Sequence, residues 1–248
     1  MQKSDIIFVN GSAAPFATWL PHVTLPESKI CATVNEGLKL SDMIAVEDIR
    51  VVHSHGPEGV HSHPTMVAYT WLDPTMAAKQ VAIMASRLTS SYPEQESSIA
   101  AEQQQLTAEL ESLTEIIDAF HNDDTGPSSV LMDTPKLKFL TRAFGLTDFH
   151  LNWEQPPNVS DAETQLKEKL AGATPSPKFM LFTDEPTTEL RLLAESLNLQ
   201  VIVVNSMKHT PIDSDYIRVM IDNSNQLKPV FGIEPKPAKP IVTDAEQN

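Results

Sequence analysis

The sequence predicts an α/β protein made of two lobes with one long helix between them, and three observations support this. In the second half of the chain, short apolar runs of strand length alternate with helical patterns, which favours βαβ units and a mostly parallel sheet. A segment in the middle repeats apolar residues every three or four positions without Gly or Pro. The length of 248 residues leaves room for two lobes of about 100 residues each.

The first part of the chain is expected to hold two strands and a well-capped helix. Ile6–Val9 and Ile49–Val52 are apolar runs of strand length. A short helix is expected over Ala14–Leu20. Asp73-Pro74 is a typical start for a longer helix, because Asp caps free N–H groups and Pro suits the first turn. This longer helix should end near Pro93.

The segment from Glu94 to His121 gives the strongest helical pattern. Twenty-eight helical residues would extend about 42 Å, which is longer than one small lobe is wide. Fewer than four heptads make a coiled coil the minor alternative, so we expect a strut that packs along both lobes. The apolar positions of this segment are Ile99, Leu106, Leu110, Leu113, Ile117 and Phe120.

The remainder of the chain alternates between strand and helix patterns. Gly145 stands where a helix C-cap is expected. The Pro- and charge-rich stretch 234–248 is expected to be a disordered tail. The predicted strands are Val130–Met132, Lys178–Thr183 and Gln200–Val204, and the predicted helices are Pro135–Phe144, Pro186–Leu197 and one near Asp215–Met220.

Four of the chain's 8 histidines lie within one stretch of 11 residues, His53 to His63. This bias is typical of a short metal-binding tract, and neutral imidazole is a common ligand for Zn and other first-row divalent metals. Two His-x-His arms flank the turn-forming residues 56–59, so one arm could fold back toward the other. In an extended arm, alternate residues face the same side, and each arm then offers two imidazoles together. The alternative is a solvated loop that binds nothing.

The composition excludes several classes of function. An excess of 33 acidic over 18 basic residues, with a net charge of −15, argues against nucleic acid as a partner. The apolar runs are too short for a membrane span. The single Cys31 excludes an internal disulfide framework. The N-terminus has no basic region followed by a long apolar stretch, so we expect no signal peptide in this chain.

The sequence also lacks the motifs that announce a catalytic centre. A zinc hydrolase often carries His-Glu-x-x-His on a helix, and no such pair occurs here. A Gly-x-Ser-x-Gly elbow and a phosphate-cradling loop are also missing. We therefore expect no enzyme. The histidines outside the tract are isolated, and they are His22, His121, His150 and His209.

Several segments together resemble one protein family, the extracytoplasmic solute-binding proteins of zinc and manganese ABC importers. Trp71-Leu72-Asp73-Pro74 is similar to the family's Trp-Leu-Asp-Pro signature, and a His-rich loop before it is a feature of zinc-specific members. Pro93–Phe120 resembles the family's linking helix, and 139–146 resembles its Tyr-Leu-Ala-Arg-Ala-Tyr-Gly-Leu segment. Residues 10–20 look like the segment after its third strand.

The resemblance implies two Rossmann-like lobes joined by one long helix, with metal between the lobes. It also implies a periplasmic or extracytoplasmic monomer that binds Zn(II), Mn(II) or another divalent ion and delivers it to an ABC permease. On this basis we divide the chain into a partial N-terminal α/β lobe at 1–93 with a His-rich loop at 53–63, a linking helix at 94–122, a C-terminal α/β lobe at 123–233 and the tail.

The chain departs from the family pattern at the metal site. The family's first two βα units, with their ligand His, are not found, so the N-terminal lobe is expected to be incomplete. Tyr69, Thr134 and Asn205 stand where further ligands are usual. Thr134 and its neighbour Asp133 are more simply interpreted as a helix cap.

The candidate metal ligands are therefore others, and several functions stay open. Glu185 follows a predicted strand, and ligand sites in α/β proteins gather at such strand ends. The alternative is structural: Asp184 would cap the next helix, and the charge of Glu185 would interact favourably with the dipole of that helix. The alternatives to import are a metal buffer or adhesin-like protein, a truncated relative without a transport role and, less favoured, a zinc-dependent hydrolase. The candidate ligands are His53, His55, His61, His63, Glu58 and Glu185.

Overall fold

The computed structural model describes residues 4–10, 22, 24–54, 60–122 and 128–233, with the backbone alone at 35, 47–54, 60–63 and 122. None of the helices in these residues is long and apolar enough to cross a membrane. The main elements in chain order are β1 (Ile7–Val9), β2 (Ile30–Ala32), α2 (Thr33–Gly37), β3 (Ala45–Ser54), β4 (Val60–Met66), α3 (Pro74–Ser91), α4 (Glu96–Asp118), β5 (Ser129–Met132), α5 (Lys138–Ala143), β6 (Thr147–His150), α6 (Val159–Gly172), β7 (Phe179–Phe182), α7 (Thr188–Ser196), β8 (Gln200–Val203) and α8 (Tyr216–Leu227).

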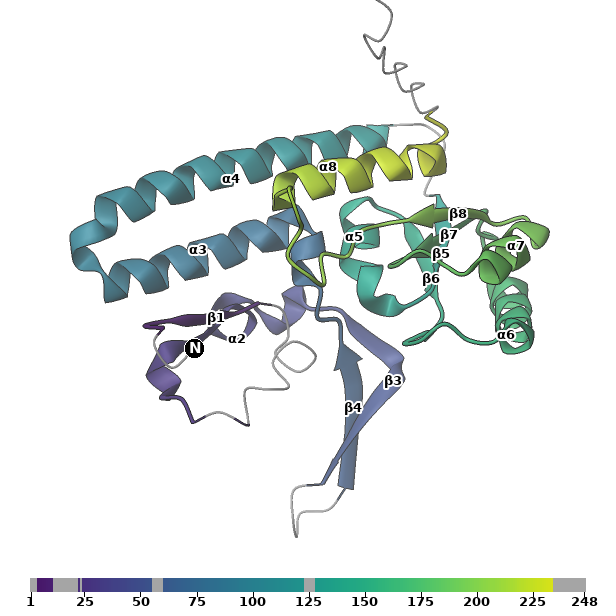
Figure 1. The fold of residues 1–248 in the computed structure, drawn as a ribbon, viewed down its shortest axis with the longest axis horizontal. Helices are drawn as coiled ribbons and strands as arrows, with labels where there is room; N and C mark the ends of the chain where they lie inside the picture. The colour runs from purple at the N-terminus through teal and green to yellow at the C-terminus, as the bar shows by residue number, and fades with distance from the viewer. Residues whose placement is uncertain (1–3, 11–21, 23, 55–59, 123–127, 234–248) are drawn as a thin grey trace, which may run out of the picture.

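The C-terminal lobe is a parallel sheet with helices on both faces (Figure 1). Its strand order is β6-β5-β7-β8, and every neighbouring pair is parallel. Val130 and Met132 of β5 face a core formed with α4, α5 and α8, whereas Leu131 faces a second core formed with α6 and α7. Both faces of the central strands are buried, which is why these strands appear in the sequence as continuous apolar runs.

The N-terminal lobe is smaller. Within the described residues, its parallel sheet consists of β1 and β2, and a separate antiparallel hairpin is formed by β3 and β4. The expected strands Ile6–Val9 and Ile49–Val52 are confirmed, the second as part of the longer β3. The expected helix at Ala14–Leu20 and the tail at 234–248 lie outside the described residues.

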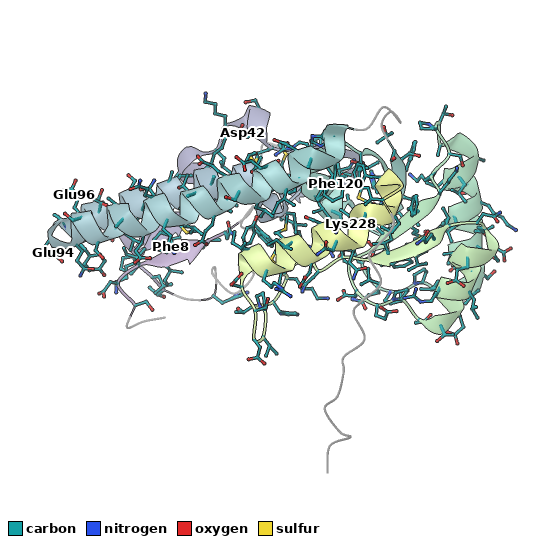
Figure 2. All side chains as sticks on the ribbon, turned by 90° about the horizontal axis from the view of Figure 1, so that it is seen from above. Phe8, Asp42, Glu94, Glu96, Phe120 and Lys228 are labelled. Carbon is teal, nitrogen blue, oxygen red and sulfur yellow. The ribbon has the colours of Figure 1, made fainter. Side chains whose placement is uncertain are left out.

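The long helix is confirmed. α4 continues into a short 3-10 turn, Ala119–Asn122, so that helical structure reaches almost the predicted end. Its C-terminal half is buried through Leu110, Leu113 and Ile117 and packs toward the second lobe. Its N-terminal half runs beside α3, and Figure 2 shows α8 next to the other end of the same helix. The helix is therefore a strut against both lobes. The boundaries that we assigned to the lobes remain a prediction.

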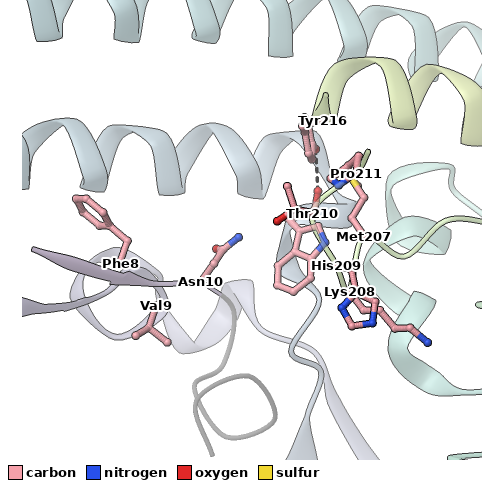
Figure 3. A pocket seen from close by; sticks show the side chains of 10 residues that line it. Phe8, Val9, Asn10, Met207, Lys208, His209, Thr210, Pro211 and Tyr216 are labelled. Carbon is pink, nitrogen blue, oxygen red and sulfur yellow. Dashed lines mark hydrogen bonds between the residues drawn. The ribbon is translucent and has the colours of Figure 1, made fainter. Parts of the chain in front are cut away.

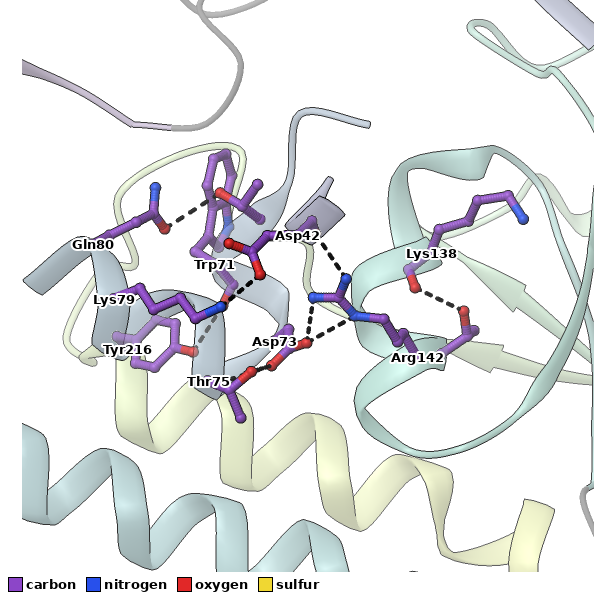
Figure 4. Close-up of polar contacts among 11 residues, drawn as sticks. Asp42, Trp71, Asp73, Thr75, Lys79, Gln80, Lys138, Arg142 and Tyr216 are labelled. Carbon is purple, nitrogen blue, oxygen red and sulfur yellow. Dashed lines mark hydrogen bonds and ion pairs between the residues drawn. The ribbon is translucent and has the colours of Figure 1, made fainter. Parts of the chain in front are cut away.

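Direct polar contacts join the two lobes at the start of α3 (Figure 4). Asp73 caps the helix by accepting from the backbone N–H of Thr75, at 2.9 Å. The other carboxylate oxygen of Asp73 accepts from Nε and Nη2 of Arg142 on α5, at 3.0 and 2.7 Å. Arg142 also donates to the carbonyl oxygen of Asp42, at 2.9 Å. The two family-like motifs, Trp71–Pro74 and 139–146, are therefore one structural unit.

A second contact joins the lobes beside this ion pair. The indole N–H of Trp71 donates to the carbonyl oxygen of Ser206 beyond β8, at 3.1 Å. The Tyr216 hydroxyl donates to the carbonyl oxygen of Trp71, at 2.7 Å, which fixes the start of α8 against the first lobe. Burial raises the pKa of Tyr216 far above its usual range, so its hydroxyl stays protonated even in alkaline solution.

We expect Arg142→Met to destabilise the protein by about 1–3 kcal/mol, because Asp73 stays buried but loses its charged donor. Lys167→Met is the matched control, since Lys167 pairs with Glu163 on the surface and such pairs contribute about 0–1 kcal/mol. Urea unfolding of both variants measures the difference. Equal losses in the two variants would contradict the central role of the Arg142–Asp73 pair.

Candidate metal centre

The described residues of the His-rich segment belong to the β3–β4 hairpin. β3 extends to Ser54 and β4 begins at Val60, so His53, His61 and His63 belong to strands. The backbone register pairs His53 with His61 and Val51 with His63. The expectation that one His-x-His arm folds back on the other is therefore confirmed for the backbone, and Figure 1 shows the hairpin projecting from the body of the molecule.

The ligand assignment itself stays a prediction. His55 and Glu58 lie outside the described residues, and the side chains of His53, His61 and His63 do as well. Among the side chains that the structure does describe, no group of three or more His, Cys, Asp or Glu could hold a metal ion.

A cavity of about 110 Å³ lies between the lobes, where the carboxyl ends of the C-terminal strands meet Tyr69. The chain leaves β5 first for β6 on one side and later returns to β7 on the other, so ligand sites are expected beside β5 and β7. This is the region in which the resemblance would place a metal. Tyr69 packs against Trp71 with ring centroids 5.0 Å apart and the ring planes tilted by 44°, and burial raises the pKa of its phenol.

Asp133 is the buried carboxyl group of this cavity. One of its oxygens accepts from the backbone N–H and the hydroxyl of Thr183, each at 3.1 Å, which links the ends of β5 and β7. Its other oxygen and the hydroxyl of Thr134 are buried without a hydrogen-bond partner. Burial raises the pKa of Asp133 to about 6, against the opposing effect of the bonds from Thr183.

The expectation of a helix cap at these two residues is wrong for Thr134. It stands at the N-cap position of the 3-10 turn Pro135–Leu137, but its side chain makes no capping hydrogen bond. Asp133 instead joins two strands of the sheet. Sequence reasoning missed this role because Thr183 is 50 residues away, and the only local signal was an acidic residue directly after a buried strand.

The other carboxylates around the cavity already have cationic partners. Asp184 pairs with Lys208 at 2.6 Å, and Glu154 pairs with Lys136 at 2.9 Å. Glu185, one of our candidate ligands, pairs with Arg191 on α7. We had considered Asp184 as the cap of that helix. The cap is instead Thr187, whose hydroxyl accepts a hydrogen bond from the backbone N–H of Leu190. In Figure 1 the sheet that contains β7 is well separated from the projecting ends of β3 and β4.

The raised pKa of Asp133 predicts a pH-dependent stability. Its folded pKa lies above the unfolded value of 3.8, so between about pH 4 and 6 the folded state binds more protons. This group's contribution therefore favours folding at low pH and is lost as pH rises through 6. Native protein should lose on the order of 2 kcal/mol more than Asp133→Asn between pH 4.5 and 7. Urea unfolding at both pH values measures this, and an identical pH response of the two proteins would contradict it.

Solved structures share this fold at low sequence identity. A mutant of FpvC from Pseudomonas aeruginosa aligns with a TM-score of 0.72 at 14% identity, covering 93% of this chain and 82% of that one. The metal-dependent lipoprotein YcdH from Bacillus subtilis aligns at 0.66 and 16%, covering 92% and 80%. The Zn(II)-bound ZnuA-like domain of Streptococcus pneumoniae AdcA aligns at 0.66 and 16%, covering 93% and 81%. A sequence comparison with curated proteins finds no match.

A family model gives the more specific result. The model described as zinc-uptake complex component A, periplasmic, matches residues 1–230. Proteins of this family are metal-binding solute-binding proteins of ABC importers rather than enzymes, and they are periplasmic or extracytoplasmic. With its fold and nearly its whole length matched, this chain belongs to the family of the periplasmic zinc-uptake component ZnuA.

Proposed function

We propose that this protein captures Zn(II) on the histidines of its β3–β4 hairpin and delivers the ion to the permease of an ABC importer. The observation that carries the proposal is the backbone register, which sets His53 directly opposite His61. The protein would act outside the cytoplasm as a monomer, as its family membership suggests. Mn(II) or another divalent ion is the alternative cargo.

Hairpin geometry supports a site shared by both strands. Directly opposite positions in an antiparallel pair have Cβ atoms about 4.5–5.5 Å apart, and alternate residues of one strand share a face. His63 follows His61 by two positions, and His55 follows His53 by two. In a regular antiparallel ladder His55 and His63 would lie on opposite sides of the His53–His61 pair, so this pair and one of the two would supply three of the four ligands of tetrahedral zinc. Glu58, between the two arms, is the nearest candidate for an oxygen ligand.

The cavity between the lobes supports the same conclusion by its chemistry. Tyr69 and Thr134 offer neutral hydroxyl groups where the family usually has histidines. Lys136 and Lys208 line the cavity and pair with Glu154 and Asp184, so these two carboxylates are not free for a metal ion. The exposed carboxylates beside the cavity, on Glu154, Asp184 and Glu185, each form an ion pair with a lysine or arginine side chain. Glu185 would reach a metal on the hairpin only if the hairpin moved toward the C-terminal sheet. We retain Glu185 as a candidate ligand for that arrangement alone.

Replacing the four tract histidines with alanine should abolish stoichiometric zinc binding in calorimetry at neutral pH. The chain offers a matched control, since replacing His22, His121, His150 and His209 removes the same number of imidazoles. That control should retain the affinity of the native protein. Unchanged zinc binding by the tract variant would disprove a hairpin site, whereas weak binding at several sites would favour a loose metal buffer.

Zinc affinity should also fall steeply with pH, because protonated imidazole cannot bind metal. Histidine has an ordinary pKa of about 6.5, so each ligating histidine steepens the loss of affinity below that value. The slope of log affinity against pH below about 6 then approaches the number of bound imidazoles. Competition with a zinc-sensitive dye between pH 5 and 7.5 measures this slope. A flat profile would show that carboxylates, and not histidines, hold the ion.

A further inference from the structure

A second and larger cleft opens between the lobes beside Trp71 (Figure 3). Its volume is about 430 Å³, within the range of small-molecule sites. One wall is the carboxyl end of β1, with Phe8 and Asn10, and the other is the segment after β8, with Lys208 and His209.

The segment after β8 is held in an unusual backbone conformation that presents these side chains. Asn205 and Asn223 exchange two hydrogen bonds of 2.9 Å, one through each backbone group of Asn205. Asn205 also accepts from the backbone N–H of Met207, whose φ of 52° lies in the left-handed region. Non-glycine residues adopt this conformation only where the surroundings enforce it, and they are concentrated at functional sites. The contact between Trp71 and Ser206 fixes the same segment from the other lobe.

The described lining of this cleft differs in charge from the molecule as a whole. The protein carries a net charge of −15, yet none of the residues described as lining the cleft is acidic. Lys208 contributes a positive charge, and His209 contributes a second donor. Lys208 also pairs with Asp184, but the two side chains are 41% and 63% exposed, and a surface pair of this kind is weak enough for a ligand to compete. The aromatic faces of Trp71 and Phe8 add apolar surface.

We propose that this cleft binds a small organic anion with an apolar or aromatic body. The carboxylate or similar group would accept hydrogen bonds from Lys208 and His209, and the body would rest on Trp71. Charge-assisted bonds of this kind are the stronger ones in proteins, and Thr210 offers a hydroxyl at the same edge. The hairpin and this cleft are separate sites, so the inference does not depend on the proposed zinc function.

Calorimetry with benzoate and indole-3-acetate, each compared with its neutral amide, tests the proposal. The metal should first be removed on a chelating resin, because soluble EDTA is itself an organic polyanion. Each acid should bind native protein at least tenfold more tightly than its amide. Lys208→Met should lower the affinity for the acids by about tenfold or more and leave the amides unchanged. Lys167→Met removes the same charge elsewhere and should change neither.

Two results would overturn the proposal. One is equal affinity of the acids and amides for native protein, including no binding of either. The other is acid binding that survives Lys208→Met while the variant keeps the thermal midpoint of native protein. His209→Gln provides an independent measurement, because it retains a hydrogen-bond donor but cannot become a cation. The His209→Gln substitution should lower the affinity for the acids less than Lys208→Met does.

Discussion

The ion pair between Arg142 and Asp73 is the constraint on which the arrangement of the lobes depends. Asp73 ends the irregular segment that carries Tyr69 and Trp71 and starts α3, while Arg142 lies on α5 of the other lobe. By fixing these two elements together, the pair sets how Trp71 meets Ser206 and how Tyr216 meets Trp71. Both cavities between the lobes are lined by residues from these same segments. The lobes are thus held by direct protein contacts.

This construction is compatible with our proposal that the metal site lies on the hairpin and not between the lobes. In the family pattern, a metal ion held by residues of both lobes would link them. Here Trp71, Asp73 and Arg142 make that link, and the exposed acidic side chains nearby, Glu154, Asp184 and Glu185, pair with lysine or arginine. The histidines are concentrated on a projecting hairpin, whose backbone register pairs His53 with His61. A hairpin can accept an ion without closure of the lobes, which leaves the cleft beside Trp71 available for a different ligand.

Much of the fold could be predicted from sequence because burial leaves regular patterns. The buried strands of the C-terminal sheet and the apolar spacing of α4 both follow from cores that extend over whole elements. The elements that were missed lack such patterns. β2 has three residues, β6 is half-buried at the edge of its sheet, and α6 buries only Ala162 and Leu166.

The candidate site also has features that could be predicted from the sequence and features that could not. The two His-x-His arms and the turn between them are local in sequence, so the hairpin could be predicted. The partnership of Asp133 with Thr183 and the conformation at Met207 could not, because both depend on contacts between distant segments. Residues 205–211 also carry no motif that marks a binding segment, and His209 looked isolated until the fold placed it opposite Asn10.

The most direct test of the relocated metal site is a crystal of the zinc-loaded protein with anomalous diffraction measured at the zinc edge. The predicted result is one strong peak at the β3–β4 hairpin, surrounded by imidazole nitrogens at about 2.0–2.1 Å. A peak between Tyr69, Asp133 and Asp184, with none at the hairpin, would contradict it and would return the metal to the space between the lobes.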